Sequence, residues 1–165
     1  MGIGLGFAGA GWLGESLIRE LPLFPELRLT AVQDVNGELA SAVGQRHGAS
    51  WRGERFEELL ARADVDAVAI STPNAFHAEQ AVAALGAGKH VLVQKPLALS
   101  AADAARVVET AKRAGRVLMV DYSYRYLATW DKLVSCCRGS GPSAAFAGCS
   151  TTSTARVRHG SSNGR

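Results

Sequence analysis

Short apolar runs alternate with longer stretches of helical period over the first 120 residues of this chain. The apolar runs lie at residues 2–8, 28–34, 66–71, 90–94 and 116–120, with a weaker one near Ala49–Trp51. Their length suits strands, and runs that are apolar throughout are typical of strands covered on both faces, as in a parallel sheet.

Between these runs, apolar residues recur at intervals of three and four, which places them on one face of a helix. The sets are Leu13, Leu17 and Leu21; Ala78, Ala81, Val82 and Leu85; and Ala104, Val107, Val108 and Ala111. Ser100 with Asp103 predicts a helix N-cap, and Gly88 and Gly115 are placed for left-handed C-terminal positions. A strand followed by a helix, repeated about five times, predicts an α/β fold with a doubly wound parallel sheet.

The first predicted strand runs directly into a glycine-rich turn, GAGWLG at residues 9–14, where a helix begins. In dinucleotide-binding folds the first glycine makes the turn, the second admits a pyrophosphate, and the third lets the helix lie close to the strand. Free N–H groups at the helix N-terminus then face the phosphates. A glycine-rich turn can also be merely a turn, but its place between strand and helix favours a phosphate site. The residues expected to line it are Gly9, Gly11, Trp12, Leu13 and Gly14.

Asp34 ends the second predicted strand, 20 residues after Gly14. A carboxylate at this position can accept hydrogen bonds from the hydroxyls of an adenosine ribose. It repels the 2′-phosphate of NADP, and the Val35-Asn36 that follows offers no arginine to bind that phosphate. We therefore expect NAD rather than NADP, unless Arg46 or Arg52 folds back towards the ribose.

Three polar residues follow the strand predicted at 66–71. Thr72 and Asn74 flank Pro73 and can bind a ribose or an amide at the carboxyl edge of the sheet; ordinary turn chemistry is the alternative. His77 lies in the first turn of the next helix, where a lone histidine is more often solvated or packed than a ligand.

A lysine follows the strand predicted at 90–94, in the sequence Gln94-Lys95-Pro96. The carboxyl ends of parallel strands face the ligand crevice of a doubly wound fold. An ammonium group there can bind a substrate hydroxyl and polarise it as hydride leaves the carbon. The alternative is a surface lysine at a strand end.

Composition narrows the class of protein. The chain has 165 residues and a net charge of +3, and no apolar run approaches the ~20 residues of a membrane span, so we expect a cytoplasmic protein without a membrane partner. Residues 132–165 contain five basic residues and no acid, which leaves 13 basic against 15 acidic residues before them. Few charges and Phe146 as the only aromatic residue of this tail argue against binding to nucleic acid.

The composition changes after Leu133 to Ser, Gly, Thr, Ala and Arg, without further Leu or Ile. Such a segment buries too little apolar surface to offset its ordering entropy, so we expect disorder. Cys136, Cys137 and Cys149 lack metal-ligand spacing, so we expect no metal site. The joint loss of Leu, Ile and acids also suits a coding sequence read out of frame; a genuine flexible tail is the alternative. The predicted boundaries are 1–134 for a dinucleotide-binding domain and 135–165 for the tail.

Four segments in order resemble a known family. They are GFAGAGWLGE, AVQDVNGELA, AVAISTPNAFHAEQAVAALGAGKHVLVQKPLALS and DYSYRY. Over about residues 3–134 they are similar to the N-terminal half of the glucose-fructose oxidoreductase/inositol dehydrogenase/MocA family. The resemblance implies a Rossmann-type domain and NAD(P)-dependent oxidation of a sugar, polyol or related hydroxyl compound.

The resemblance also implies roles for the matching residues. Lys95 matches the lysine that contacts the reacting hydroxyl, Pro96 matches a proline that is often cis, and Arg125 matches an arginine near the nicotinamide. The glycines would hold the pyrophosphate and Asp34 the adenosine ribose. The cofactor cleft would be lined by Thr72, Pro73, Asn74, His77 and Gln94.

The chain departs from this family in three ways. Gln94 stands where Glu is usual, which removes a negative charge, and Ser123 stands where Asn is usual. The second, antiparallel α+β domain, which supplies the rest of the substrate pocket, is missing. We therefore expect an oxidoreductase domain that is incomplete as an enzyme; a non-catalytic dinucleotide sensor is the alternative, although a sensor has no need of Lys95.

Four aromatic residues and a leucine precede the change in composition. If the second domain does not cover them, they form an apolar patch that favours self-association. They are Tyr122, Tyr124, Tyr126, Leu127 and Trp130.

Overall fold

The computed structural model describes residues 2–123 and residue 128. The predicted tail, Arg125 and the aromatic residues from Tyr124 to Trp130 lie outside the described residues. Contacts divide the chain into Met1–Tyr122 and Ser123–Arg165, and the fold below is that of the first unit. Its elements are β1 (Ile3–Ala8), α1 (Trp12–Glu20), η1 (Leu21–Leu23), β2 (Leu27–Gln33), α2 (Gly37–Arg46), β3 (Trp51–Gly53), α3 (Phe56–Leu60), β4 (Ala67–Ile70), η2 (Asn74–Phe76), α4 (His77–Gly86), β5 (His90–Gln94), α5 (Ala101–Ala114) and β6 (Leu118–Asp121).

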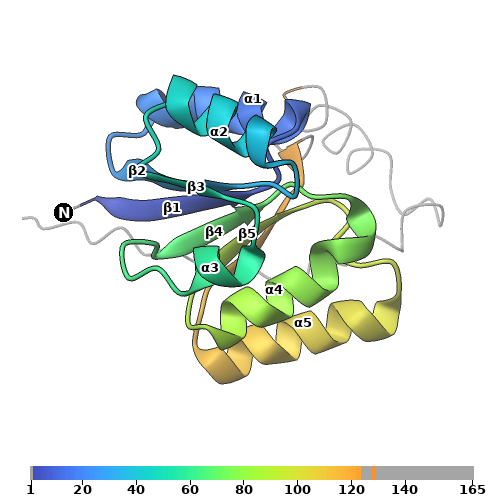
Figure 1. Ribbon diagram of the computed structural model, residues 1–165. Coiled ribbons are helices and arrows are strands. Elements are labelled where there is room, and N and C mark those ends of the chain that lie inside the picture. Colours follow the sequence, from blue (N-terminus) through green and yellow to red (C-terminus); the bar gives the residue numbers. More distant parts are fainter. Residues whose placement is uncertain (1, 124–127, 129–165) are drawn as a thin grey trace, which may run out of the picture. The chain divides into compact units, whose positions relative to one another are not determined.

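The six strands form one parallel sheet in the order β3-β2-β1-β4-β5-β6. The chain moves outwards from β1 to β3, crosses back to β4 and then moves the other way. Because crossovers between parallel strands are right-handed, this reversal puts α1 and α2 on one face and the later helices on the other. Figure 1 shows α1 and α2 on one side and α3, α4 and α5 on the opposite side. The doubly wound α/β fold predicted from the sequence is confirmed.

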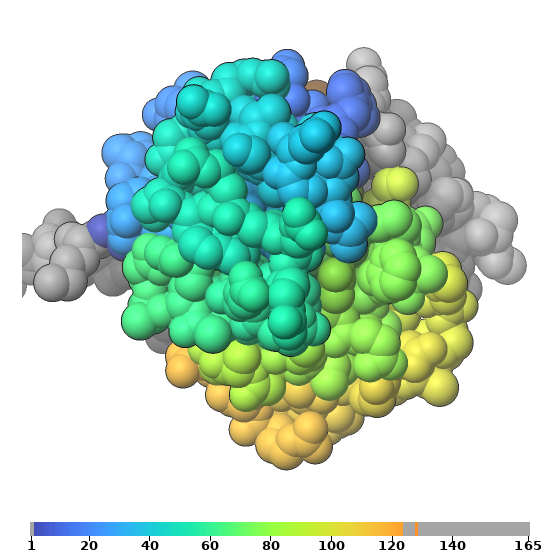
Figure 2. Space-filling model, viewed as in Figure 1, coloured from blue at the N-terminus to red at the C-terminus, as the bar shows by residue number. Residues whose placement is uncertain are grey.

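Two apolar clusters fill the space between the sheet and its helices. The cluster under α1 and α2 includes Phe7, Ile18, Val32 and Val43. The cluster on the other face includes Leu59, Ile70, Leu85, Val93 and Val107. Figure 2 shows α3 at the surface between the α2 part and the α4 and α5 part. Burial on both faces explains why the strands read as continuous apolar runs.

The ends of the elements agree closely with the sequence signals. The Ser100 hydroxyl accepts a hydrogen bond from the Asp103 N–H at 3.0 Å, and Gly88 and Gly115 have φ values of +78° and +62°. The weak run near Ala49–Trp51 corresponds to β3, and Asp34 lies one residue beyond the end of β2. α2 and α3 were not among the predicted apolar sets; α2 faces the core with the small residues Ala40, Val43 and Gly44. Among the described residues, no helix has both the length and the apolar character that a bilayer crossing requires.

Candidate functional site

The loop between β1 and α1 owes its shape to two close backbone approaches. Gly9 has φ of +90°, and a Cβ there would lie 2.7 Å from the carbonyl carbon of Ser71. A Cβ on Gly14 would lie 2.1 Å from the carbonyl oxygen of Gly9. Both distances are far below van der Waals contact. The chain itself therefore requires glycine at these two positions, whatever the loop binds.

Gly11 differs from Gly9 and Gly14, because the surrounding protein does not require glycine at this position. Its φ of −63° and ψ of −178° suit any residue, and no described atom lies within 4 Å of a Cβ built on it. Gly11 is the N-cap of the nine-residue helix α1 and makes no side-chain cap bond. The space beside it thus faces the helix N-terminus, where N–H groups and the helix dipole favour a phosphate.

Asp34 lies against the same loop. Its Oδ2 accepts a hydrogen bond from the Ala10 N–H at 2.8 Å, and its Oδ1 accepts one from the Asn36 N–H at 2.9 Å. These bonds fix the carboxylate between the end of β2 and the glycine loop. Carboxylate oxygens have further lone pairs, so the group can still accept bonds from ribose hydroxyls.

Two arginines could reverse the cofactor preference: Arg46 has another partner, and Arg52 packs along α2. The Arg46 guanidinium pairs with the carboxylate of Glu15 on α1. A hydrogen bond from His47 and the pairing with Arg46 lower the pKa of Glu15. The side chain of Arg52 lies along Gly44 of α2, where a Cβ would meet its Cγ at 2.4 Å.

Ser71 is a candidate residue that the sequence reasoning missed. It follows β4, and a Cβ built on Gly14 would lie 3.6 Å from the Ser71 Cβ. Its Oγ is buried and has no hydrogen-bond partner among the described residues. A buried hydroxyl without a partner is costly, so a ligand that bonds to it would offset that cost. The available signal was its place at a strand end, directly before Thr72.

The loop after β4 carries the next predicted site residues. The Thr72 hydroxyl donates a hydrogen bond to the side-chain oxygen of Gln80 on α4. Pro73 and Asn74 lie at the surface, and Asn74 begins the short turn η2. These residues stand at the carboxyl end of β4, next to the loop after β1, because β1 and β4 are neighbours in the sheet.

His77 connects this loop to the lysine segment. Its side chain is buried, with 1% exposure, at the first position of α4. Its Nδ1 lies 2.7 Å from the carbonyl oxygen of Pro96, and its Nε2 lies 2.8 Å from that of Thr72. A neutral imidazole has one N–H and can donate to one of these acceptors, whereas the doubly protonated ring donates to both. The packed interpretation of His77 is confirmed; a contact with a cofactor stays a prediction.

Lys95 follows β5 and is exposed. The peptide bond between Lys95 and Pro96 is cis, as the family resemblance implied. The preceding Gln94 is buried, and its side-chain amide donates a hydrogen bond to the carboxylate of Asp121 at the end of β6. Asp121 was not among the predicted site residues, because nothing in the sequence marks it as a neighbour of Gln94.

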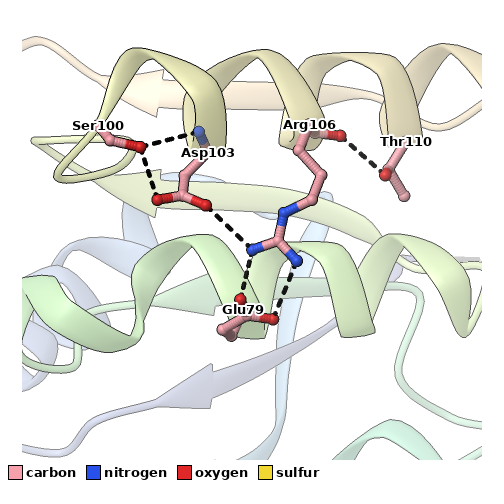
Figure 3. Close-up of polar contacts among 5 residues, drawn as sticks. All are labelled: Glu79, Ser100, Asp103, Arg106 and Thr110. Carbon is pink, nitrogen blue, oxygen red and sulfur yellow. Dashed lines mark hydrogen bonds and ion pairs between the residues drawn. The ribbon is translucent and has the colours of Figure 1, made fainter.

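Helices α4 and α5, which flank the lysine segment on the two sides in sequence, are joined at the surface. Figure 3 shows Arg106 of α5 between Glu79 of α4 and Asp103 of its own helix, with Ser100 capping the start of α5. These ion pairs are solvent-exposed and contribute little individually. Glu79 lies in the first turn of α4, and His77, whose side chain makes the buried contacts described above, begins the same turn.

Several features of the site suit a dinucleotide. Among the described residues, no group of three His, Cys, Asp or Glu side chains could hold a metal. Three features fit a dinucleotide: the space beside Gly11, the Asp34 carboxylate at the same loop, and the buried Ser71 hydroxyl without a partner. They lie where the strand order reverses between β1 and β4, which is where doubly wound folds bind their ligands.

Comparison with characterised proteins supports this assignment. The profile of a family described as "Oxidoreductase family, NAD-binding Rossmann fold" matches residues 3–122. A 4-carboxy-2-hydroxymuconate-6-semialdehyde dehydrogenase of Sphingobium sp. strain SYK-6 is 40% identical over 122 residues, covering 74% of this chain and 39% of the relative. The scyllo-inositol 2-dehydrogenase (NADP(+)) IolU of Bacillus subtilis is 32% identical over 125 residues, covering 76% and 38%.

Two solved structures are also similar. KijD10, a 3-ketoreductase from Actinomadura kijaniata in complex with TDP-benzene and NADP, has a TM-score of 0.77 and 30% identity, covering 86% of this chain and 44% of that one. GenD2 from gentamicin A biosynthesis, in complex with NAD, has a TM-score of 0.77 and 28% identity, covering 82% and 39%. The chain spans about two fifths of the length of these relatives. With a profile match over most of its length and a glycine loop of the required geometry, the chain belongs to the glucose-fructose oxidoreductase/inositol dehydrogenase/MocA family of NAD(P)-binding oxidoreductases.

Proposed function

We propose that this chain binds NAD across the carboxyl edge of its sheet and serves an oxidoreductase that transfers hydride between the nicotinamide and a hydroxyl-bearing carbon of a sugar or polyol. The observation that carries the proposal is the open space beside Gly11 at the N-terminus of α1. No described part of the protein uses that space, and its donors suit a pyrophosphate.

The two ends of the cofactor have different partners in this proposal. Asp34 would bind the adenosine ribose, because it follows β2 and is held against the glycine loop. The nicotinamide half would then lie over the β4 and β5 half of the sheet, near Ser71, Thr72 and Lys95, since doubly wound folds bind the two mononucleotides on opposite sides of the reversal point.

NAD is proposed as the preferred cofactor. The Asp34 carboxylate would lie near a 2′-phosphate, and the Arg46 guanidinium is already paired with Glu15. One relative has NADP in its name, and one similar structure is bound to NADP. The relative affinity of this chain for NAD and NADP therefore has to be measured directly. We expect NAD to bind at least about tenfold more tightly than NADP, because like charges in close contact cost on the order of a kcal/mol or more.

The proposed reaction requires few chemical steps from the chain's own residues. Bound NAD would supply the hydride acceptor for oxidation of the substrate and, in its reduced form, the hydride donor for the reverse reaction. Lys95 would donate a hydrogen bond to the substrate oxygen and stabilise the charge that develops on it as the C–O bond order changes. This role is supported by the exposure of Lys95 and by its position directly after the carboxyl end of β5.

The substrate class is proposed by analogy with relatives that are about twice as long as this chain. One acts on an inositol by its name, and another is a ketoreductase bound to a TDP derivative. A sugar or polyol is therefore proposed for the whole protein, with part of the pocket supplied from outside the described residues.

Calorimetric titration with NAD tests the proposal directly. We expect saturable binding by the chain and its loss in Gly11→Val, whose side chain would occupy the phosphate space. Gly86→Val is the matched control, because a Cβ at Gly86 also meets no described atom within 4 Å and Gly86 ends α4. Tight NAD binding by a folded Gly11→Val chain would refute the phosphate-loop assignment.

A further proposal concerns domain organisation. The change in composition after Leu133 supports a dinucleotide-binding domain at 1–134 and a tail at 135–165 that is either genuine or read out of frame. Repeated sequencing of the coding DNA decides between the two. A shifted frame that encodes a second domain would support the out-of-frame interpretation, and an unchanged frame running to a stop codon would refute it.

A further inference from the structure

Gln94 and Asp121 end two neighbouring strands at the edge where the cofactor is proposed to bind. The register of the sheet pairs Gln94 of β5 with Asp121 of β6. Gln94 is buried, with 6% exposure, and Asp121 is partly buried. Lys95 is the next residue along the chain. One member of the pair is therefore the immediate neighbour of the proposed catalytic lysine in the chain.

The hydrogen bond between the two side chains sets the orientation of the amide. An ionised carboxylate only accepts hydrogen bonds, so the group of Gln94 that faces Asp121 has to be its NH₂. The Gln94 Nε2 accordingly donates to the Asp121 Oδ2. The amide oxygen is then the acceptor that Gln94 has left for other partners. Asp121 thus determines which end of the Gln94 amide is available at the edge of the sheet.

The pair also determines where the negative charge lies. A glutamate at position 94 would place two carboxylates in contact at a poorly solvated position, where one of them would have to hold a proton or move away. A neutral Gln94 removes this conflict and leaves Asp121 as the carboxylate of the pair. Because neighbouring strands are about 4.8 Å apart, the charge lies about one strand further from the β1–β4 crevice than position 94.

We infer that Asp121 is a positioning residue of the proposed cofactor site: it orients the Gln94 amide, and the pair keeps negative charge away from the nicotinamide end. This inference rests on the proposed function. Its consequence concerns the oxidation state of the cofactor. The nicotinamide ring is positively charged in NAD⁺ and neutral in NADH, so a nearby carboxylate favours NAD⁺. A carboxylate on β6 should favour binding of NAD⁺ over NADH less strongly than a carboxylate at position 94 of β5 would.

A charge swap tests the pair without any cofactor. The variants are Gln94→Glu, Asp121→Asn and the two combined, and the readout is the midpoint of thermal unfolding. We expect Gln94→Glu to lower the midpoint and the double variant to recover most of the loss, because the amide introduced at position 121 can donate to the new carboxylate at position 94. Equal losses from Gln94→Glu in both backgrounds would overturn the inferred pairing.

The same double variant tests the effect on the cofactor, and it keeps the net charge of the chain unchanged. The ratio of the NADH and NAD⁺ dissociation constants is measured by titration for the natural chain and for Gln94→Glu/Asp121→Asn. Moving the carboxylate to β5 should shift this ratio towards NAD⁺ on the order of fivefold. A purely structural pair would restore stability without changing the ratio, and an unchanged ratio overturns the inferred role.

The two readouts separate this inference from the proposed function. If neither nucleotide binds to the natural chain, both the proposed function and the inferred effect on the cofactor fail. The unfolding midpoints of the single and double variants still decide whether the two side chains are paired. If both nucleotides bind and the ratio does not move, the proposed function stands and Asp121 has no positioning role.

Discussion

The glycine loop after β1 and the lysine segment after β5 lie at the same edge of the sheet, and different contacts hold them in place. The loop is shaped by backbone atoms at short range: Gly9 meets Ser71, and Gly14 meets the carbonyl of Gly9. The lysine segment is held by side chains from elsewhere, with His77 bonded to the Pro96 carbonyl and Gln94 bonded to Asp121.

This difference separates the two kinds of residue that a substitution can affect. In the loop, the glycines required for folding and the glycine proposed for binding lie within six residues and are distinguished by what a Cβ would meet. In the lysine segment, the exposed Lys95 is available for chemistry, while buried residues on neighbouring elements fix its backbone. In the glycine loop, substitutions of different glycines should therefore affect either folding or binding. In the lysine segment, substitution of Lys95 should affect binding or chemistry, and substitution of the buried residues should affect folding.

The largest effect is expected in the glycine loop, from Gly14→Ala. The new Cβ would lie 2.1 Å from the Gly9 carbonyl oxygen, so helix and loop have to move apart. We expect a loss of about 3 kcal/mol or more in the free energy of unfolding, measured by denaturant titration.

Gly11→Ala in the same loop is the matched control for this comparison. Its Cβ meets no described atom, and its backbone is extended rather than left-handed. We expect stability to change by less than about 1 kcal/mol, since alanine is tolerated at an N-cap with a modest loss. Equal destabilisation by both substitutions would contradict the distinction between the two glycines.

The next effect is expected from His77→Phe in the lysine segment. Phenylalanine fills much of the same space but has no N–H to donate to the carbonyl of Thr72 or of Pro96. We expect the free energy of unfolding to fall by about 1–3 kcal/mol, because polar groups lose a buried partner. Denaturant titration measures this loss. Unchanged stability would mean that the ring contributes packing alone.

A smaller and more selective effect is expected from Lys95→Ala. The side chain is exposed, so the free energy of unfolding should change by no more than about 0.5 kcal/mol. NAD affinity measured by calorimetry should be retained, because the lysine is assigned to the substrate oxygen and not to the cofactor. Complete loss of NAD binding would show that Lys95 belongs to the cofactor site.

The smallest effect is expected where α4 and α5 meet at the surface. Arg106→Gln removes the ion pairs with Glu79 and Asp103 (Figure 3). Exposed pairs gain little over solvation, so the midpoint of thermal unfolding should fall by at most about 2 °C and the difference should shrink at high salt. A large loss would show that the surface network, and not His77, anchors the lysine segment.

Particular residues show how far sequence reasoning reached. The strands, the three helices and the Ser100 cap were predicted correctly, because each depends on residues within one or two turns of one another. Two helix faces differ in detail: the buried residues of α1 are Gly14 and Ile18 rather than the predicted leucines, and Val108 of α5 is exposed. Trp12 and Leu13 were named with the glycine loop on the motif alone, and a contact between them and a cofactor stays a prediction. Ser71 was missed, because an unpartnered hydroxyl is recognised only when its surroundings are known.

His77 and Gln94 were named from the sequence, but their partners were not. The bond from His77 to Pro96 joins residues 19 apart, and the bond from Gln94 to Asp121 joins residues 27 apart. A helix lies between the two members of each pair along the chain, so no local pattern relates them. In the sequence, Gln94 indicated only the loss of a negative charge. Its partner, Asp121, is recognised only in the folded sheet.

The sequence by itself determined the fold class and the glycine loop, because hydrophobic period and glycine placement are local properties that act before distant contacts form. The tertiary structure decided which glycine is free to face a ligand, which carbonyls His77 binds, and on which strand the negative charge beside Lys95 lies. These depend on side chains from separate elements, which meet only when the parallel strands align their carboxyl ends at one edge.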